Sequence, residues 1–296
     1  MTRVALVTCL HIPEVDHDED LLVQALTSRG IDAVVAAWDD PAFAWDACDA
    51  AVLRSTWNYY EDIASFLAWA SSTAQTTLLL NPLEVVRANC HKSYLGQLAA
   101  SGVPIVPTEF LPAGEAWNLA HRARTRGWER VVFKPAVSAG SHNTYASSTA
   151  DLDSLESQLQ THLADVDMML QPFIDSVSGY GERSLVFVDE VFQHAIRKSP
   201  RFATDAESVS RSSEPVTESE RALAESVLHA SRSLWSDAAQ SHDPLLYARV
   251  DLVPDTHGAP LLMELELIEP SLFLAQHAPT LDALADAIAA RVRARS

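Results

Sequence analysis

Short apolar runs alternate with amphipathic stretches over the first 80 residues. Four of these runs have the length of buried strands, and the segments between them place leucine and alanine at helical spacing. The first such segment begins at the acidic Asp18–Asp20 and ends at Gly30, as a helix would. Alternation of this kind predicts an α/β fold with a mostly parallel sheet covered by helices. The predicted strands are 3–9, 31–37, 50–54 and 77–80, with a further helix at 61–71.

The middle of the chain predicts a second module, and the pattern then changes. Residues 103–111 contain two prolines, so we expect an edge strand or an extended connector there. From residue 184 onward, paired apolar runs around short polar turns predict two antiparallel hairpins, giving an α+β part. The segment 199–215 is poor in large apolar residues, and we expect a disordered loop or a lid. The other predicted helices are 92–100, 115–126, 152–163, 217–237 and 280–295; the strands are 130–134, 168–173, 185–188, 191–197, 246–253 and 261–268.

Composition narrows the class of protein. The 296 residues carry 21 basic and 40 acidic side chains, a formal charge of −19, and 48% of them are hydrophobic. This is a globular composition, and its negative charge makes nucleic acid an unfavourable partner. No apolar run reaches the length of a membrane span and no signal peptide is visible, so we expect a cytoplasmic protein that acts on a small molecule. Three widely spaced cysteines indicate neither a disulfide framework nor a zinc site.

Lysine is rare in this chain. Of the 21 basic residues only Lys92, Lys134 and Lys198 are lysines. An ammonium is a compact point charge that can reach between phosphate oxygens, whereas the guanidinium of arginine is a planar fork. The three lysines are therefore candidates for anion binding. The alternative is that these few lysines occur at these positions by chance.

The last predicted hairpin gathers carboxylates on one face. By the period of two, Arg249 and Asp251 share a face with Glu264 and Glu266 of the partner strand. The same alternation places Tyr247, Val253, Leu262 and Ile268 on this face, and Ala248, Val250, Leu252, Leu261, Met263, Leu265 and Leu267 on an apolar face. Like charges on adjacent strands destabilise a sheet unless they are neutralised, and a divalent cation such as Mg²⁺ would do so. A solvated polar face without an ion is the alternative.

Two further segments suggest nucleotide binding. Lys134 ends an apolar strand, and a loop of small residues that includes Ser138 and Gly140 follows, so its backbone N–H groups can face phosphates. The chain has neither GxxxxGK[ST] nor GxGxxG, and an ordinary strand-to-helix loop is the alternative. In the second segment, Pro172 interrupts an apolar strand and frees backbone groups that can read an adenine edge. Gln171, Phe173 and Ile174 surround this break, and Glu182 is a candidate ribose acceptor; an edge strand that ends at Pro172 is the alternative.

Taken in order, these segments resemble the ATP-grasp superfamily, in particular its glutathione synthetase-like carboxylate-amine ligases. The likeness spans about residues 81–275, and the N-terminal part looks like the pre-ATP-grasp domain of that family. It implies a pre-ATP-grasp substrate domain at 1–86 and a catalytic domain at 87–296 with a lid at about 100–172. The segments that carry it are Asn89–Lys92, Phe133–Pro135, Gln171–Ile174, His194–Lys198, Arg249–Asp251 and Met263–Ser271.

The resemblance also implies roles for individual residues. ATP would be held by Lys92, Lys134, Ser138, Gly140, Gln171, Phe173, Ile174 and Glu182, and two Mg²⁺ ions by Asp251, Glu264 and Glu266. Arg197 would stabilise the charge of phosphoryl transfer, with Lys198 and Arg249 as further catalytic residues. Substrate contacts are expected from Arg54–Tyr59 (Arg54, Ser55 and Thr56 above all), from Asp16–Asp20, and from Glu269 and Ser271. Two features depart from the family pattern: Glu266 stands where asparagine is common, and the phosphate loop is poor in glycine.

The implied reaction is ATP-dependent C–N bond formation. A small amino-acid-like carboxylate would be activated as an acyl phosphate, and an amine would then attack it to give an amide-type bond. Family activities include dipeptide formation and the intramolecular closure that yields D-cycloserine, and the sequence leaves both open, as it does a homo-oligomer. A regulatory module that binds ATP and Mg²⁺ without ligation, and a metal-dependent hydrolase, are the alternative functions.

Overall fold

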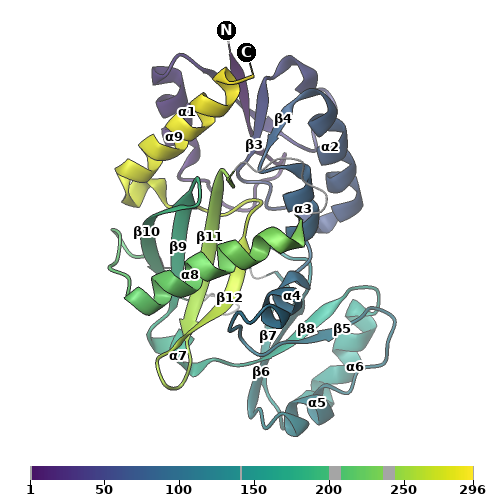
Figure 1. Ribbon diagram of the computed structural model, residues 1–296. Helices are drawn as coiled ribbons and strands as arrows, with labels where there is room; N and C mark the ends of the chain where they lie inside the picture. The colour runs from purple at the N-terminus through teal and green to yellow at the C-terminus, as the bar shows by residue number, and fades with distance from the viewer. Residues whose placement is uncertain (1, 141, 200–207, 236–243, 296) are drawn as a thin grey trace.

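The computed structural model describes residues 2–140, 142–199, 208–235 and 244–295, without the side chains of 157, 158 and 160–163. Within this part the chain forms three four-stranded sheets, one above the other in Figure 1. No helix of the described residues is long and apolar enough to cross a membrane.

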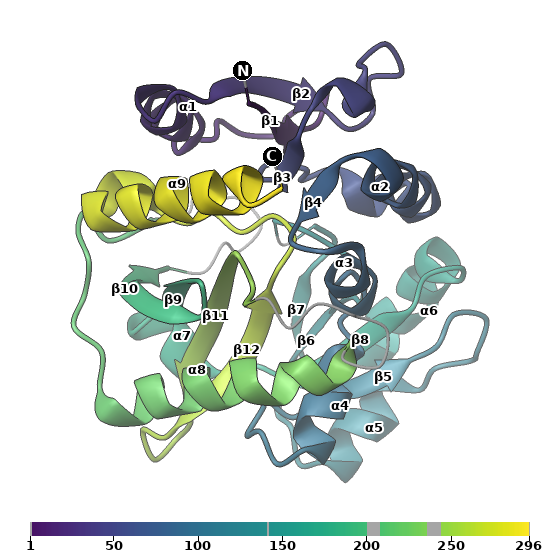
Figure 2. The same cartoon turned by 45° about the horizontal axis from the view of Figure 1, so that its top comes forward.

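The N-terminal sheet is parallel, with strand order β2-β1-β3-β4, as the sequence pattern predicts. Its faces are covered by α1, α2 and the last helix, α9, which returns from the far end of the chain and lies between this sheet and the central one (Figure 2). Leu6, Leu284 and Val186 belong to one apolar cluster there, so the N-terminal and central sheets share a core. The bounds are β1 Arg3–Thr8, α1 Glu19–Ser28, β2 Asp32–Ala37, β3 Ala50–Leu53, α2 Ile63–Thr76, β4 Leu78–Leu80 and α9 Ala278–Arg293.

A smaller antiparallel sheet, ordered β5-β8-β6-β7, stands at the other end of the molecule. Helices α5 and α6 pack on it through a cluster that includes Phe133, Leu170 and Leu119. The proline-containing segment becomes the edge strand β5, one of the two alternatives that its prolines suggest. The bounds are β5 Glu109–Leu111, α5 Leu119–Thr125, β6 Arg130–Pro135, β7 Tyr145–Ser148, α6 Leu152–Leu163 and β8 Met168–Pro172.

The central sheet has the order β10-β9-β11-β12 and is antiparallel, as the two predicted hairpins require. Helix α8 crosses its apolar face in Figure 1, where Ala224 and Val227 join the cluster of Val250 and Leu265. Thr217 and Glu220 cap the start of α8 reciprocally. The bounds are α3 Leu83–Asn89, α4 Tyr94–Ala100, α7 Asp175–Gly179, β9 Glu182–Val188, β10 Val191–Lys198, α8 Glu218–Ser231, β11 Tyr247–Pro254 and β12 Pro260–Glu266.

A β-bulge corrects the alternation expected for β12. Asp251 pairs with Glu264, but the next residue, Leu252, pairs with Leu262, so Met263 is the extra residue. Leu262, expected on the carboxylate face, is instead fully buried in the apolar cluster. Met263, expected on the apolar face, lines the cavity described below. The carboxylates beyond the bulge keep the predicted face because the register changes only on its other side.

Several short elements differ from the predictions because few residues carry their periodicity. The helix expected at 92–100 begins at Tyr94 and follows a separate α3, and β7 forms where a loop of small residues was expected. The helix expected at 217–237 ends as α8 at Ser231, and residues 236–237 lie outside the described part. Of the segment 199–215, residues 200–207 are also outside it. The described remainder lies along β10, where Ser210 N–H donates to the Arg197 carbonyl and Glu214 N–H to the Ala195 carbonyl. A disordered loop or a lid stays a prediction for this segment.

Candidate functional site

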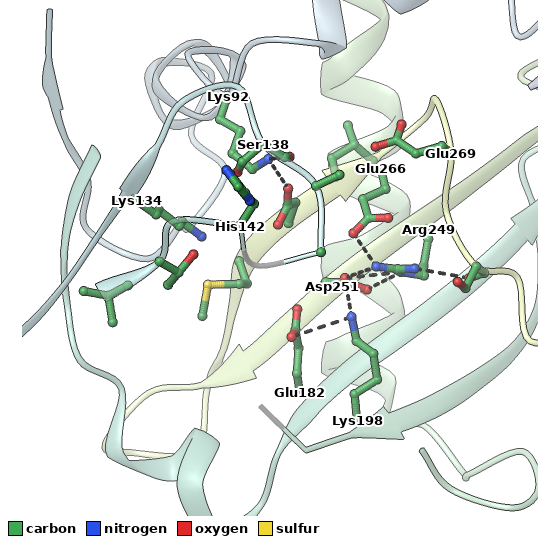
Figure 3. A pocket seen from close by; sticks show the side chains of 18 of the residues that line it. Lys92, Lys134, Ser138, His142, Glu182, Lys198, Arg249, Asp251, Glu266 and Glu269 are labelled. Carbon is green, nitrogen blue, oxygen red and sulfur yellow. Dashed lines mark hydrogen bonds and ion pairs between the residues drawn. The ribbon is translucent and has the colours of Figure 1, made fainter. Parts of the chain in front are cut away.

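A cavity of about 440 Å³ lies where the three sheets meet, within the usual size range of ligand sites. All three lysines of the chain, Lys92, Lys134 and Lys198, line it, although they come from a helix start, from β6 and from β10. Figure 3 shows them around the carboxylates of the central sheet. The residue type that is rarest among the basic side chains is therefore concentrated in one cavity.

The carboxylate face of the last hairpin forms one wall of this cavity. Cross-strand pairing sets Arg249 opposite Glu266 and Asp251 opposite Glu264, and all four side chains line the cavity. Because residues two apart on a strand share a face, the alternating sequence of both strands brings these charges together. The convergence predicted for the three carboxylates is present in the structure.

Cations neutralise this wall. The Arg249 guanidinium donates to both Asp251 oxygens, with Nε–Oδ1 at 2.9 Å and Nη2–Oδ2 at 2.8 Å, and it also donates to Glu266. Lys198 Nζ lies 3.0 Å from Asp251 Oδ2 and 3.7 Å from Glu182 Oε2. Burial alone would raise the pKa of Asp251, but Arg249 and Lys198 outweigh it and hold that pKa well below its ordinary value.

Lys92 joins the loop of small residues after β6 to the carboxylate wall. Its Nζ lies 2.7 Å from Glu264 Oε1 and donates to the Ser138 carbonyl at 2.8 Å, while its backbone N–H donates to Ala136. Burial opposes the charge of both partners, yet the pair raises the pKa of Lys92 and lowers that of Glu264. Ser138 is buried and Gly140 has a φ of +58°, and both line the cavity.

Lys134 differs from the other two lysines. Among the described residues its ammonium has neither a hydrogen bond nor an ion pair, and Figure 3 shows it beside the cavity without a partner. Burial lowers its pKa because no carboxylate is close enough to compensate fully. A buried cation without a partner is stabilised when an anion binds next to it.

Three carboxyl groups of the cavity are held in an unfavourable environment. Burial raises the pKa of Glu182 to about 8, that of Glu266 to about 7 and that of Glu269 to about 8, and neighbouring carboxylates add to the shift. A divalent cation would relieve this repulsion, and carboxylate oxygens are the ligands that Mg²⁺ prefers. Within the described part of the chain, no three His, Cys, Asp or Glu side chains are already arranged around a single metal position. The donor chemistry fits Mg²⁺, while the oxygens are now paired with Lys92, Lys198 and Arg249.

The residues expected around adenine also line the cavity. Gln171, at the end of β8, donates from Nε2 to Thr108 Oγ1 at 2.8 Å and is buried. Phe173 and Ile174 follow it, and Arg130 covers the Phe173 ring with its guanidinium carbon 3.7 Å from the ring centre. The Phe173 and Ile174 side chains add apolar surface to the cavity lining, on which an aromatic ring can pack.

Some predicted site residues do not line the cavity, among them Arg197, Arg54, Ser55 and Thr56. Arg197 points outward on β10, with 45% of its side chain exposed and Glu214 at 3.8 Å, because residues alternate along a strand and Lys198 takes the inward position. Arg54, Ser55 and Thr56 are buried behind the cavity wall. The prediction that Arg54, Ser55 and Thr56 contact the substrate directly is therefore wrong.

Aromatic residues from the N-terminal part of the chain also line the cavity. They are Trp57, Tyr59 and Tyr60, and the Tyr60 ring lies 4.6 Å from that of His142 in the loop after β6. Trp57 and Tyr59 belong to the stretch expected to contact substrate, whereas Asp16–Asp20 does not line the cavity and Pro13 and Glu14 do. Tyr60 and His142 are not among the predicted site residues, and their only signal in the sequence is a position in polar loops that follow predicted strands.

Side chains from three regions fix the loop 269–274, which follows β12. Trp57 Nε1 donates to the Glu269 carbonyl, Arg54 to that of Pro270 and Arg249 to that of Ser271. The Asp18 carboxylate accepts the N–H groups of Leu272 and Leu274, at 3.1 and 2.8 Å. Arg54 and Asp18 therefore act on the site by positioning this loop, and the predicted substrate residues Glu269 and Ser271 do line the cavity.

Comparisons with known proteins agree with this arrangement. Residues 4–81 match the family model described as the N-terminal domain of D-cycloserine synthetase DcsG. Over 285 residues the chain is 34% identical to the cycloserine biosynthesis protein DcsG of Streptomyces lavendulae, covering 93% of each chain. The crystal structure of D-cycloserine synthetase DcsG superimposes with a TM-score of 0.87, at 31% identity, over 98% of this chain and 99% of that one. D-alanine–D-alanine ligase from Bacillus anthracis, complexed with ATP, gives a TM-score of 0.67 over 99% and 97% of the chains; at 18% identity it shows the shared fold alone.

Proposed function

The chain belongs to the family of the D-cycloserine synthetase DcsG within the ATP-grasp ligases, and we propose that it closes the ring of D-cycloserine. The family makes it an ATP-dependent enzyme that forms C–N bonds, so neither the regulatory module nor the hydrolase is retained. In the proposed reaction the carboxylate of an amino acid is joined to a nitrogen of the same molecule. Hydrolysis of the ring amide of D-cycloserine would give β-aminooxy-D-alanine, which defines the class of open-chain substrate.

One observation carries the choice of product. Residues 4–81, which match the model of the synthetase's N-terminal domain, supply Trp57, Tyr59 and Tyr60 to the lining of the cavity. These side chains would contact the amino acid, and the segment that carries them matches the cycloserine family. Dipeptide formation has no comparable support, because the dipeptide ligase is similar in fold alone.

The residues present fit ATP and Mg²⁺. Lys134, which has no partner among the described residues, and Lys92 would hold the phosphates, with Ser138 and Gly140 beside them. Gln171, Phe173 and Ile174 would bind adenine, and Glu182 would bind ribose. Asp251, Glu264 and Glu266 would hold Mg²⁺, and two ions suit a wall of three carboxylates.

The chain contributes positioning and charge to the reaction. ATP would supply the phosphoryl group that activates the carboxylate, and Mg²⁺ would screen the charge of its phosphates. Arg249 and Lys198 lie at the carboxylate wall and would stabilise the negative charge that develops there. Ser271 and Glu269 line the same cavity as Trp57, Tyr59 and Tyr60, and these aromatic residues would exclude water that hydrolyses the activated carboxylate.

We also retain as proposals the domain division and the setting of the enzyme. Residues 1–86 would form the substrate domain and 87–296 the catalytic domain, with a lid at 100–172; because 86 falls inside α3, a boundary before Leu83 fits the helix better. We place the enzyme in the cytoplasm, which would supply its ATP. A homo-oligomer also stays a prediction.

The test is ADP formation that depends on the amino acid. The purified protein is incubated with ATP, Mg²⁺ and a panel of amino acid derivatives that includes β-aminooxy-D-alanine, and products are identified by mass. D-Cycloserine formed together with an equal amount of ADP supports the proposal. A dipeptide product, or no response to any member of the panel, contradicts it.

A further inference from the structure

We propose that the Glu269 carboxylate binds the ammonium group of the amino acid substrate, the group that is not consumed in ring closure. This inference rests on the proposed function, since it assigns one residue to one group of that substrate. The acidic side chains of the cavity differ in whether a basic side chain lies beside them. Asp251, Glu264, Glu266 and Glu182 each have a lysine or arginine within 4.0 Å.

Glu269 has no such partner. Within the described part of the chain its carboxyl group makes neither an ion pair nor a hydrogen bond, and Figure 3 shows it next to Glu266 with no interaction drawn. Leaving a carboxylate of the cavity without a counter-ion is costly, and the cost is recovered when a cation binds. Lys134 presents the complementary case among the described residues, a cation that awaits an anion.

The backbone around Glu269 is rigidly held, which argues against a side chain that merely lacks a fixed place. Trp57 binds the carbonyl of Glu269 itself at 2.9 Å, and Arg54 binds that of the next residue, Pro270, at 3.2 Å. Arg249 and Asp18 hold the residues that follow. A carboxylate on a loop fixed at consecutive residues is pre-organised for a ligand, because little conformational entropy is lost on binding.

The surroundings of Glu269 favour an organic cation over a second metal ion. Trp57 donates to the backbone carbonyl of Glu269, and Tyr59 and Tyr60 line the same cavity. The faces of aromatic rings attract ammonium groups. The metal-binding candidates are on β11 and β12, whereas Glu269 is beyond the end of β12. Arg249 and Glu269 line the same cavity, so an amino acid whose carboxylate lies beside Arg249 would present its ammonium group to Glu269. We therefore assign Glu269 as the residue that selects substrates carrying a free amino group.

The experiment compares two ligands and three proteins. D-Cycloserine and isoxazolidin-3-one have the same ring and differ in the amino group alone. Their binding to the wild type, to Glu269→Gln and to the exposed control Glu129→Gln is measured by calorimetry in the presence of ADP and Mg²⁺. We expect the wild type and E129Q to bind D-cycloserine at least tenfold more tightly than isoxazolidin-3-one, and E269Q to bind the two rings equally.

A structural role for Glu269 would weaken both ligands alike, so the ratio of the two affinities distinguishes recognition from folding. The assignment is overturned if the wild type binds the two rings with equal affinity, or if E269Q still prefers D-cycloserine to isoxazolidin-3-one. ADP formation on β-aminooxy-D-alanine is measured in parallel with the wild type. Its absence overturns the proposed function, whereas its presence together with an unchanged ratio in E269Q overturns the inference about Glu269 alone.

Discussion

The Nζ atom of Lys92 lies 2.7 Å from Oε1 of Glu264. Lys92 is in the turn just before α4, and Glu264 is on β12. The same ammonium donates to the carbonyl of Ser138, so one buried charge joins the loop after β6 to the carboxylate wall. Binding of nucleotide and binding of Mg²⁺ should be coupled through this contact.

Replacing Lys92 by methionine should lower kcat/KM for ATP by about 100-fold or more. The change removes a cation from the proposed phosphate site and leaves Glu264 without its counter-ion, which costs more than the loss of an exposed pair. Steady-state ADP release measures the effect. Arg124→Met, which removes an ion pair between two exposed side chains, is the control and should behave as wild type. Equal activity of the two variants would exclude Lys92 from the phosphate site.

Glu264→Gln should raise the Mg²⁺ concentration for half-maximal activity about tenfold or more. A glutamine offers a neutral oxygen in place of a charged one, and Mg²⁺ binds such a ligand less strongly. Titration of activity with Mg²⁺ at saturating ATP provides the measurement, with Glu129→Gln as the control. If half-saturation does not change, Glu264 does not contact the metal.

The two arginines that the sequence suggested for catalysis should behave differently. Arg249→Met removes the partner of Asp251, of Glu266 and of the Ser271 carbonyl, and kcat should fall about 100-fold or more. Arg197→Met removes an exposed side chain beside Glu214, and kcat should stay within about threefold of wild type. A large loss in R197M would show that Arg197 reaches the reaction centre when substrates are bound.

Asp18 should matter to the site without touching the substrate. Asp18→Asn leaves one acceptor oxygen for two backbone N–H groups, so we expect unfolding free energy to fall by about 1–3 kcal/mol. Loss of order in the loop should raise KM for the amino acid and leave KM for ATP unchanged. Urea unfolding and initial rates test both points, and Asp20→Asn, exposed on the same helix, is the control. A change in KM for ATP alone would contradict the positioning role.

The stability of the ligand-free protein should fall as pH rises from about 5 to 8. The pKa values of Glu182 and Glu269, about 8, and of Glu266, about 7, lie above their ordinary value of 4.5, so the folded state binds more protons than the unfolded state in this window. The contribution of these groups is complete below pH 4.5 and is lost as pH passes through the raised values. Asp251 and Glu264, whose pKa values are lowered, act in the opposite direction only at acid pH.

Thermal unfolding at several pH values checks this sign. Added Mg²⁺ should raise the unfolding temperature more at pH 8 than at pH 6, because metal and protons compete for the same carboxylates. A Mg²⁺ effect that is the same at both pH values would mean that these carboxylates are not the metal ligands.

Local pattern determined much of this protein. Apolar runs and helical spacing were enough for the parallel sheet and the two hairpins, because a strand or helix must present its apolar side to a core. Period-two alternation in 247–253 and 264–266 was enough to place Arg249, Asp251, Glu264 and Glu266 on one face. The scarcity of lysine pointed to Lys92, Lys134 and Lys198, and all three line the cavity.

Tertiary structure decided what local periodicity does not encode. The bulge at Met263 reversed the faces of two residues, because register depends on the partner strand and not on the sequence of one strand. Arg197 and Lys198 are neighbours in sequence, yet only packing chose which of them faces the cavity. Asp18 and Arg54 reach the loop 269–274 across more than 200 residues, and the sequence has no signal for such a contact. The unpaired state of Lys134 and Glu269 likewise follows from where every other charge comes to lie, a property of the folded chain as a whole.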